Sequence, residues 1–396
     1  MAILLKGGMV YQGHGFVRAD LRMQDGVIEG IGTGLSEADA QVADVSGRRI
    51  VPGFLDIHTH GAVGVDVNAA TAEDYEKICR FHAGQGTTGW LCSVLTDTRE
   101  QTLWCIEEYK RWKGLEHKGS RLLGIHLEGP FLSPEYKGAM PEHLLQKPNG
   151  ALVREYQEAA GGEIRYITVS PEIEGMADFI PELCRLGMVV AIGHSGADYE
   201  TARKAIANGA MGATHTSNAM RLLHQHEPAI WGAVLEDDKV YCEMICDGRH
   251  LHPGTVRLIL KAKGTGRVVA ITDSIMAAGL PDGNYKLGVN DVVVVDGDAR
   301  LANGGSRAGS TLTTGKALEN LLAFTGRPLE EIVPLLTENP AKLAGVYDRV
   351  GSLEEGKDAD VVVLDGECRI EATYVKGECC FDGAKPFGGF NYDKEV

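Results

Sequence analysis

Eight short apolar segments, separated by stretches of helical character, run through the middle of the chain and restrict its fold more than any other feature. Continuous apolar runs are typical of strands that are covered on both faces, and therefore of parallel sheets. The segments lie at residues 53–60, 87–96, 121–131, 163–172, 188–196, 212–220, 241–250 and 268–274. Eight strand–helix units over about 290 residues predict an α/β protein built on a TIM (β/α)8 barrel.

The stretches between these segments have helical composition, and several end in glycine, which commonly terminates a helix. We expect helices within residues 72–86, 99–114, 176–187 and 198–209.

The two ends of the chain have a different pattern, with short apolar segments between Gly, Asp and Asn residues that predict β-strands. Neither end alone can cover both faces of a sheet. We therefore expect residues 1–51 and 346–396 to form one small β-sandwich domain together. Residues 52–345 would then form the catalytic barrel, inserted between the two parts.

Composition excludes several classes of protein. The 396 residues include 39 Lys and Arg against 55 Asp and Glu, a net charge of −16, which argues against binding to nucleic acid or to an anionic membrane. No apolar run approaches the ~18 residues of a membrane helix, and the first apolar run is too short for a secretory signal. The nine cysteines lack the spacing of a zinc module, so we expect reduced thiols and a cytoplasmic protein.

Most of the eight segments end in a side chain that can perform chemistry. The ends of parallel barrel strands open onto one face, so these side chains are expected to converge although up to 215 positions separate them. They are His58 and His60 in the first segment, Glu128 in the third, His194 in the fifth, His215 in the sixth, His250 in the seventh and Asp273 in the eighth.

The residue types predict a metal centre. Two histidines and one carboxylate form a catalytic metal pattern, which Glu128, His194 and His215 supply. Residues i and i+2 of a strand point to the same side, so His58 and His60 can share one ion and form a second position with Asp273. Alternatively, Asp273 serves alone as the base that takes a proton from the attacking water. A single histidine at a strand end is usually structural, but the complete set is not explained in that way.

The remaining histidines carry less information. His14, His82, His117 and His143 show no such placement, and we expect them on the surface or in the core. His224, His226 and His252 follow the sixth and seventh segments, and their role stays open at this point.

Several motifs in order along the chain carry a family resemblance: HTH after PGFLD, HLEGPFL, GHS, THTSNAM, DGRH and TDS. Together they resemble the amidohydrolase superfamily and, within it, the N-acetylglucosamine-6-phosphate deacetylases. The resemblance covers nearly the whole chain. Its HLEGPF motif is quite specific, because many other amidohydrolases place a carbamylated lysine where this chain has Glu128.

The resemblance implies an enzyme that hydrolyses the N-acetyl group of N-acetylglucosamine 6-phosphate in a homodimer. Its metal would be held by Glu128, His194 and His215, and the intact His58 and His60 allow one or two ions per subunit. Zinc is the expected ion, although Fe²⁺, Mn²⁺ and Co²⁺ accept the same ligands.

The same resemblance implies roles for further residues. Asp273 resembles the catalytic acid and base, and His250 a histidine that contacts the substrate. Asn218 and the Ala219 backbone resemble the turn that binds the sugar and its phosphate. The backbone of Ala139 and the loop 306–308, which includes Ala308, resemble segments that touch or close over the ligand.

This chain departs from the family pattern at three positions. The family usually has an arginine before Glu-Pro, which binds the phosphate and is thought to reach across from the partner subunit; here His226 takes its place. A neutral histidine is a much weaker phosphate ligand than a guanidinium. Arg307 and Arg249 stand where the family usually has apolar residues. Our hypothesis is that Arg307, together with Arg249, replaces the lost contact; alternatively, Arg307 pairs with a surface carboxylate or points into solvent.

Other functions stay open from the sequence. One is the deacetylation of a different N-acetylamino sugar, such as N-acetylgalactosamine 6-phosphate or an unphosphorylated sugar. Another is the hydrolysis of an unrelated amide. A third, a scaffold that has lost catalysis, conflicts with the presence of the metal ligands and of Asp273.

Overall fold

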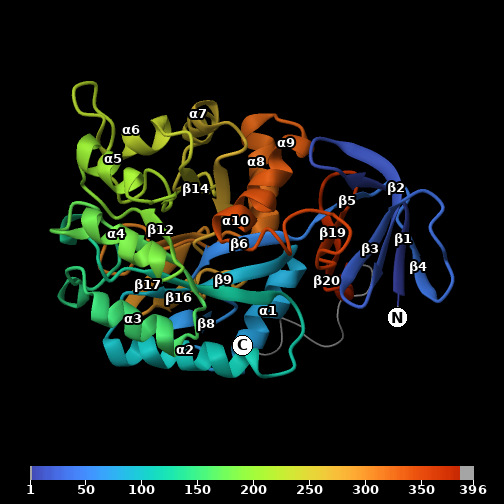
Figure 1. Cartoon of the computed structure of the whole chain (residues 1–396), viewed down its shortest axis with the longest axis horizontal. Coiled ribbons are helices and arrows are strands. Elements are labelled where there is room, and N and C mark those ends of the chain that lie inside the picture. Colours follow the sequence, from blue (N-terminus) through green and yellow to red (C-terminus); the bar gives the residue numbers. More distant parts are fainter. Residues whose placement is uncertain (1, 384–396) are drawn as a thin grey trace.

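A computed structural model describes residues 2–383, and all eight predicted strands form in it. They are β6 (Phe54–Thr59), β9 (Thr87–Leu95), β10 (Arg121–Glu128), β11 (Ile164–Val169), β12 (Val189–Ile192), β13 (Gly212–Ala213), β14 (Tyr241–Ile245) and β15 (Val268–Ile271). Each pairs in parallel with its neighbour in one eight-stranded sheet, and nearly all of their residues are buried. The predicted TIM barrel is therefore confirmed (Figure 1).

Hydrogen bonds just beyond the strand ends close the barrel between its first and last strands. The amide of Asp273 donates to the carbonyl of His58 at 2.8 Å, and the amide of His60 donates to the carbonyl of Ser274 at 2.7 Å. Two segments more than 200 residues apart are thereby held together where the predicted site residues lie.

Helices surround the barrel, and the four predicted ones are confirmed as α1 (Tyr75–Gly84), α2 (Arg99–Lys113), α4 (Met176–Arg185) and α5 (Tyr199–Ala207). Local chemistry defines their ends: Thr98 accepts a hydrogen bond from the amide of Gln101 at the start of α2. The other helices are α3 (Gly150–Ala159), α6 (Ala229–Glu236), α7 (Pro253–Lys263), α8 (Thr314–Thr325), α9 (Leu329–Leu336) and α10 (Glu338–Leu343).

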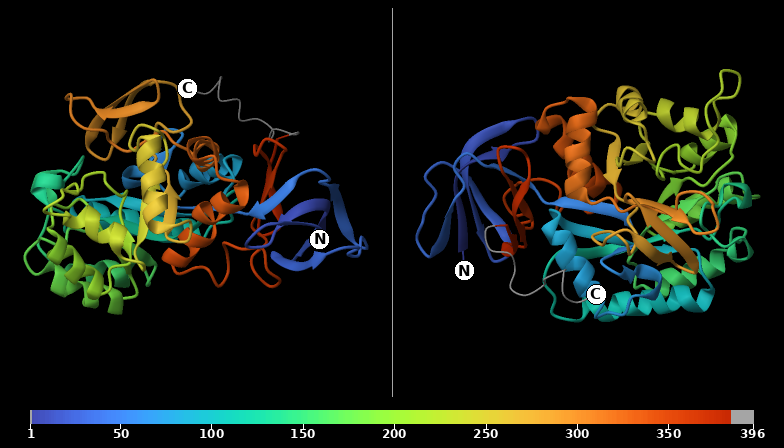
Figure 2. Two further views of the ribbon diagram at one scale, coloured as in Figure 1. Left: turned by 90° about the horizontal axis from the view of Figure 1, so that it is seen from above. Right: turned by 180° about the vertical axis from the view of Figure 1, so that it is seen from behind.

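The two ends of the chain meet in a small β domain at one end of the molecule (Figures 1 and 2). Its strands join in a single sheet of order β21-β20-β19-β5-β1-β2-β3, with β4 also paired to β1, around a hydrophobic core of its own. They are β1 (Ala2–Tyr11), β2 (Phe16–Gln24), β3 (Val27–Gly32), β4 (Ala40–Asp44), β5 (Arg49–Pro52), β19 (Val361–Leu364), β20 (Ile370–Val375) and β21 (Glu378–Asp382). Of the region predicted as its C-terminal part, residues 384–396 lie outside the described chain.

An antiparallel sheet that the sequence analysis did not anticipate lies between β15 and α8. It consists of β16 (Gly283–Leu287), β17 (Asn290–Val295) and β18 (Asp298–Leu301). Buried Leu287, Val292 and Val294 pack it against Leu95 and Ile275, at the end of the barrel where the strands terminate. A short hairpin of β7 (Gly61–Ala62) and β8 (Val65–Asp66) follows the first barrel strand.

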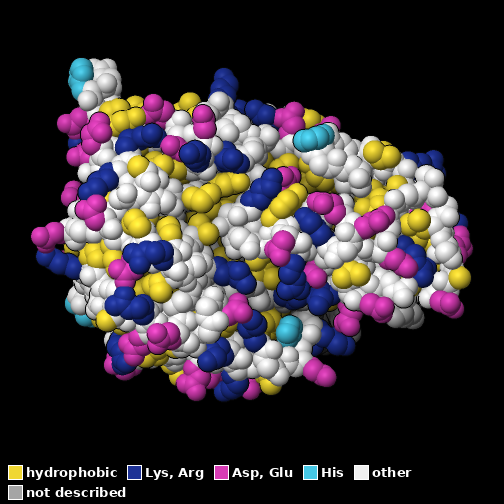
Figure 3. All heavy atoms as spheres, in the orientation of Figure 1, with side chains coloured by type: hydrophobic (Ala, Val, Ile, Leu, Met, Phe, Trp, Pro, Cys, Tyr) yellow, Lys and Arg dark blue, Asp and Glu magenta, His cyan; other side chains and the backbone are white. Residues whose placement is uncertain are grey.

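The surface matches the mixed charge of the sequence. Figure 3 shows Lys and Arg side chains interspersed with Asp and Glu over the face drawn. Among residues 2–383, no helix has both the length and the apolar character needed to cross a membrane.

Candidate active site

Six predicted side chains converge at the carboxyl ends of the barrel strands, and all six are buried. They fall into two groups of potential metal ligands: His58, His60 and Asp273 form one, and Glu128, His194 and His215 form the other. The strand ends therefore bring together the residues that the sequence analysis selected as ligands.

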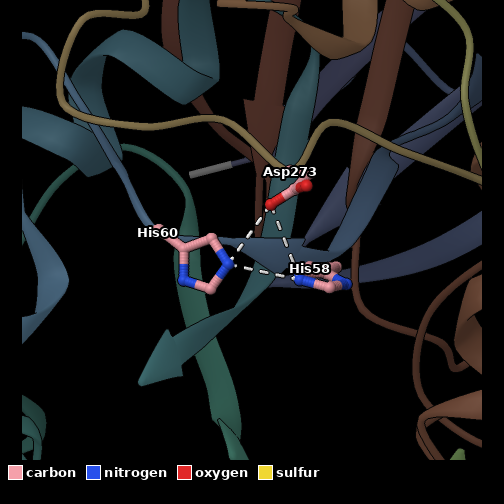
Figure 4. A group of neighbouring side chains, drawn as sticks. All are labelled: His58, His60 and Asp273. Carbon is pink, nitrogen blue, oxygen red and sulfur yellow. Dashed lines mark hydrogen bonds and ion pairs between the residues drawn. The ribbon is translucent and has the colours of Figure 1, made fainter. Parts of the chain in front are cut away.

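The first group joins β6 to the end of β15 (Figure 4). The Nε2 atoms of His58 and His60 lie 3.3 Å apart, and Asp273 Oδ1 lies 3.7 Å from the first and 3.2 Å from the second. One carboxylate oxygen and two imidazole nitrogens thus face a common point.

The second group is centred on Glu128 at the end of β10. Its Oε1 lies 3.1 Å from His194 Nε2 and 3.3 Å from His215 Nε2, and the two nitrogens are 3.0 Å apart. Glu128 also reaches the first group, because its Oε2 lies 3.2 Å from His60 Nε2. The Glu128 carboxylate therefore contacts both groups of potential ligands.

Hydrogen bonding at the far side of each ring tests whether these residues suit a metal. All four histidines have Nδ1 next to a backbone carbonyl or a carboxylate, so Nδ1 carries the proton and the Nε2 lone pair faces the centre. The pairs are His58 with Glu243 at 3.1 Å, His60 with Ser93 at 2.9 Å, His194 with Tyr136 at 2.8 Å and His215 with Asn218 at 3.1 Å. Four nitrogen lone pairs and two carboxylates, arranged in these two groups, fit divalent cations.

Charge interactions inside the cluster favour a positive charge at its centre. Burial by itself lowers the pKa of His60, but Asp273 and Glu128 raise that pKa to about 9. Burial raises the pKa of Glu128, yet His58, His194 and His215 hold it well below its usual range. The pKa of Asp273 is lowered because hydrogen bonding to His60 and the nearness of His58 outweigh burial. Both acids are therefore ionised and available as ligands or bases.

A cavity of about 640 Å³ opens above this cluster, a size typical of small-molecule sites. His60, Glu128, His194, His215 and Asp273 line it, while His58 is fully buried beneath them. Its walls include every residue predicted to contact the substrate except His226: Ala139, Asn218, Ala219, His250, Arg307 and Ala308.

His250 is fixed within this cavity by a carboxylate. Its Nδ1 lies 2.6 Å from Asp247 Oδ2, and its amide donates to Asp247 Oδ1 at 2.7 Å. Hydrogen bonding to His250 also holds the pKa of Asp247 below its usual value, although burial opposes this. His250 thus lines the cavity with its ring held by Asp247.

Two arginines occupy the rim of the cavity. Arg307 donates from Nε to Asp298 Oδ1 at 2.7 Å and from Nη2 to Oδ2 at 3.2 Å, and Arg300 Nε donates to the same Oδ2 at 2.9 Å. Arg307 therefore pairs with a carboxylate, which was the alternative considered in the sequence analysis. It nevertheless lines the cavity together with Arg300. Arg249 bonds instead to the backbone carbonyl of Asp296 and does not line the cavity.

His226 lies on the loop 221–228, which projects from the body of the molecule near α5 and α6 (Figure 1). It is exposed, as is His224, and neither lines the cavity. His252 caps α7 by accepting a hydrogen bond from the amide of Gly254. Within one subunit, these three histidines are outside the site.

Sequence reasoning missed Arg300, which lies in β18, and Glu243, which lies inside β14. A run of four valines at 292–295, followed by an Asp-Gly turn at 296–297, signals the hairpin that carries Arg300. The signal for Glu243 is a lone acid within the apolar segment 240–246, where a fully buried carboxylate is rare unless it is paired.

Comparison with known proteins agrees with this geometry. A model of the amidohydrolase family matches residues 49–388. An N-acetylglucosamine-6-phosphate deacetylase of Bacillus subtilis (strain 168) is 35% identical over 335 residues, 84% of each chain. An N-acetylgalactosamine-6-phosphate deacetylase of Escherichia coli O157:H7 is 33% identical and covers 90% of this chain and 93% of its own. An N-acetyl-D-glucosamine-6-phosphate deacetylase variant of Mycobacterium smegmatis, solved with N-acetyl-D-glucosamine-6-phosphate, superposes with a TM-score of 0.90 at 33% identity. The match covers 96% of this chain and 99% of that one.

Proposed function

This chain belongs to the amidohydrolase family, and from that premise we propose that it hydrolyses the N-acetyl group of N-acetylglucosamine 6-phosphate to glucosamine 6-phosphate and acetate. The observation that carries the proposal is the buried set of four histidine Nε2 atoms and two carboxylates at the floor of a cavity of sugar-phosphate size. The names of relatives that match most of the chain supply the substrate.

A metal centre supports amide hydrolysis. Glu128, His194 and His215 would hold one divalent ion, and His58, His60 and Asp273 offer a second position. We propose Zn²⁺, which is commonly bound by such nitrogen and oxygen ligands. When bound, the ion supplies a Lewis acid that polarises the amide carbonyl and makes water a better nucleophile at neutral pH.

Asp273 performs the proton transfers in this proposal. Its lowered pKa keeps the carboxylate ionised, so it can accept a proton from the attacking water. It then returns this proton to the amide nitrogen, because an amine leaves readily only when it is protonated. His250, fixed by Asp247, lies on the cavity wall and would hold the carbonyl oxygen or orient the sugar.

The substrate phosphate requires positive charge, and the rim of the cavity provides it. We propose that Arg307 binds the phosphate and that Arg300 joins it in place of Arg249. One Asp298 carboxylate balances only one of the two guanidinium charges, and several N–H groups remain for a phosphate. Asn218, Ala219, Ala139 and Ala308 line the same cavity and would surround the sugar.

We propose a cytoplasmic homodimer as the working form. Buried free thiols at Cys79, Cys92, Cys105, Cys242 and Cys246 suit a reducing compartment. The loop 221–228 exposes Leu222 and Leu223 beside His226, and a second copy would cover these apolar side chains. His226 would then reach the partner's cavity, as the family resemblance implies.

Acetate release from three substrates side by side tests the proposed function. Metal-loaded protein receives N-acetylglucosamine 6-phosphate, its galactosamine epimer and unphosphorylated N-acetylglucosamine. The proposal predicts the highest kcat/KM for the first. A preference for either other sugar, or turnover of none, would reject the proposed substrate while leaving the membership in the family intact.

A further inference from the structure

One oxygen of Glu243 contacts both groups of metal ligands from beneath. Its Oε2 accepts a hydrogen bond from His58 Nδ1 at 3.1 Å and another from the backbone amide of His215 at 3.0 Å. His58 belongs to one group and His215 to the other. Glu243 lies in the middle of β14, and its side chain is fully buried.

Burying an ionised carboxylate this deeply costs folding free energy unless a positive charge compensates it. Among the described residues, Glu243 Oε1 accepts no hydrogen bond of standard geometry, and the buried Tyr166 hydroxyl near it, whose pKa is raised by burial and by Glu243, is a neutral group. No Lys or Arg pairs with Glu243 in residues 2–383. In that part of the chain, the pair with His58 links Glu243 to the centre above it.

The number of buried acids bears on how many ions the centre holds. Glu128, Asp273 and Glu243 are three buried carboxylates within or directly beneath this centre. One divalent ion leaves a net negative charge on these three carboxylates, which favours a second cation. A carboxylate behind a metal-bound histidine also fixes the ring and makes its free nitrogen more basic.

We propose that Glu243 is a positioning residue that links the two metal positions and makes this chain bind a second ion. It keeps the proton of His58 on Nδ1, so that Nε2 faces the ion, and it adds the negative charge that a second cation requires. Its bond to the amide of His215 keeps that ligand in place at the same time. The inference rests on the metal centre of the proposed function and not on the identity of the substrate.

Metal binding by the Glu243→Gln variant provides the test. The glutamine oxygen can still accept both hydrogen bonds, so only the charge is lost; Glu243→Ala removes both the bonds and the charge. Glu108→Gln is the matched control, because Glu108 is also buried and accepts a backbone amide hydrogen bond, from Ala72, far from the centre. Metal-free forms of all four proteins are titrated with Co²⁺ and followed by calorimetry and by visible absorption.

We expect two ions in the wild type and in Glu108→Gln. In Glu243→Gln the affinity for the second ion should fall by about 10–100-fold, with a smaller effect on the first. A merely structural role would lower the Tm of the metal-free Glu243→Gln protein without changing its affinity for the second ion. In Glu243→Ala, binding at both positions should weaken.

Three results would overturn the inference: a wild type that binds one ion, a Glu243→Gln variant that binds two with wild-type affinity, or equal losses in Glu243→Gln and Glu108→Gln. Because the titration uses no substrate, it is independent of the proposed reaction. A protein that shows the expected Co²⁺ binding but does not release acetate from N-acetylglucosamine 6-phosphate would refute the proposed function alone.

Discussion

Three residues of the centre have a backbone conformation that residues other than glycine rarely adopt. His194, His215 and Asp273 have φ angles of 46°, 29° and 50°. Such left-handed geometry costs about 1–3 kcal/mol at each position and is found mainly at functional sites. Here it occurs directly after the barrel strands, where it turns each side chain toward the centre. The surrounding fold therefore sustains strain in order to place these ligands.

At the same scale, Arg307→Ala tests the phosphate contact. We expect kcat/KM for N-acetylglucosamine 6-phosphate to fall about 10–100-fold, the value of a lost charge-assisted hydrogen bond, with less than about a threefold change for the unphosphorylated sugar. Arg300→Ala should likewise reduce kcat/KM for the phosphorylated sugar much more than for the unphosphorylated sugar. Arg203→Ala is the matched control, because Arg203 pairs with Asp237 on the surface at 2.8 Å, away from the cavity. An equal, small loss on both sugars would contradict the assignment.

Residues at strand ends were predictable from the sequence, whereas residues inside elements were not. His58, His60, Glu128, His194, His215 and Asp273 terminate apolar segments, and barrel topology requires such ends to converge. Glu243 lies inside a strand, and only the register of β14 turns it toward His58. Arg300 depends on a hairpin packing over the cavity, which is a tertiary contact that no local pattern specifies.

At the scale of elements, the apolar runs predicted all eight barrel strands because parallel strands are covered on both sides. The sheet β16–β18 was not anticipated, although its residues alternate in burial and Asp296-Gly297 joins two strands with a two-residue turn. This sheet and the segment 134–140 together form much of the cavity wall. Such a sheet is an insertion between a barrel strand and the next helix. The repeating strand–helix pattern of the barrel therefore does not predict it.

At this scale, we predict that the loop 221–228 forms the interface between two subunits. Leu222 is 59% exposed and Leu223 49% exposed in one subunit. Replacing both with serine should convert the proposed homodimer of 42.5 kDa subunits into monomers, measured by sedimentation velocity. Leu258→Ser, at an equally exposed leucine of α7, should leave the dimer intact. A double variant that stays dimeric would place the interface elsewhere.

For the whole molecule, the metal centre also supports the fold. The hydrogen bonds that close the barrel involve His58, His60 and Asp273, so an ion bound there would hold the first and last strands together. Binding at 100 to 1,000 times Kd stabilises a protein by about 2.7–4.1 kcal/mol. In a chain of this length, chelation should therefore lower Tm by roughly 3–5 °C, with recovery when Zn²⁺ is added. An unchanged Tm after verified metal removal would contradict this role.

The most direct test of the account is acetate release from N-acetylglucosamine 6-phosphate by three preparations: metal-free protein, metal-loaded protein and metal-loaded Asp273→Asn. We predict turnover by the metal-loaded wild type only. The asparagine variant should lose about 10²–10⁴-fold in kcat, because no carboxylate remains to take and return the proton. Full activity in the metal-free protein or in Asp273→Asn would contradict the central claim that these converging strand ends form a metal-dependent deacetylase.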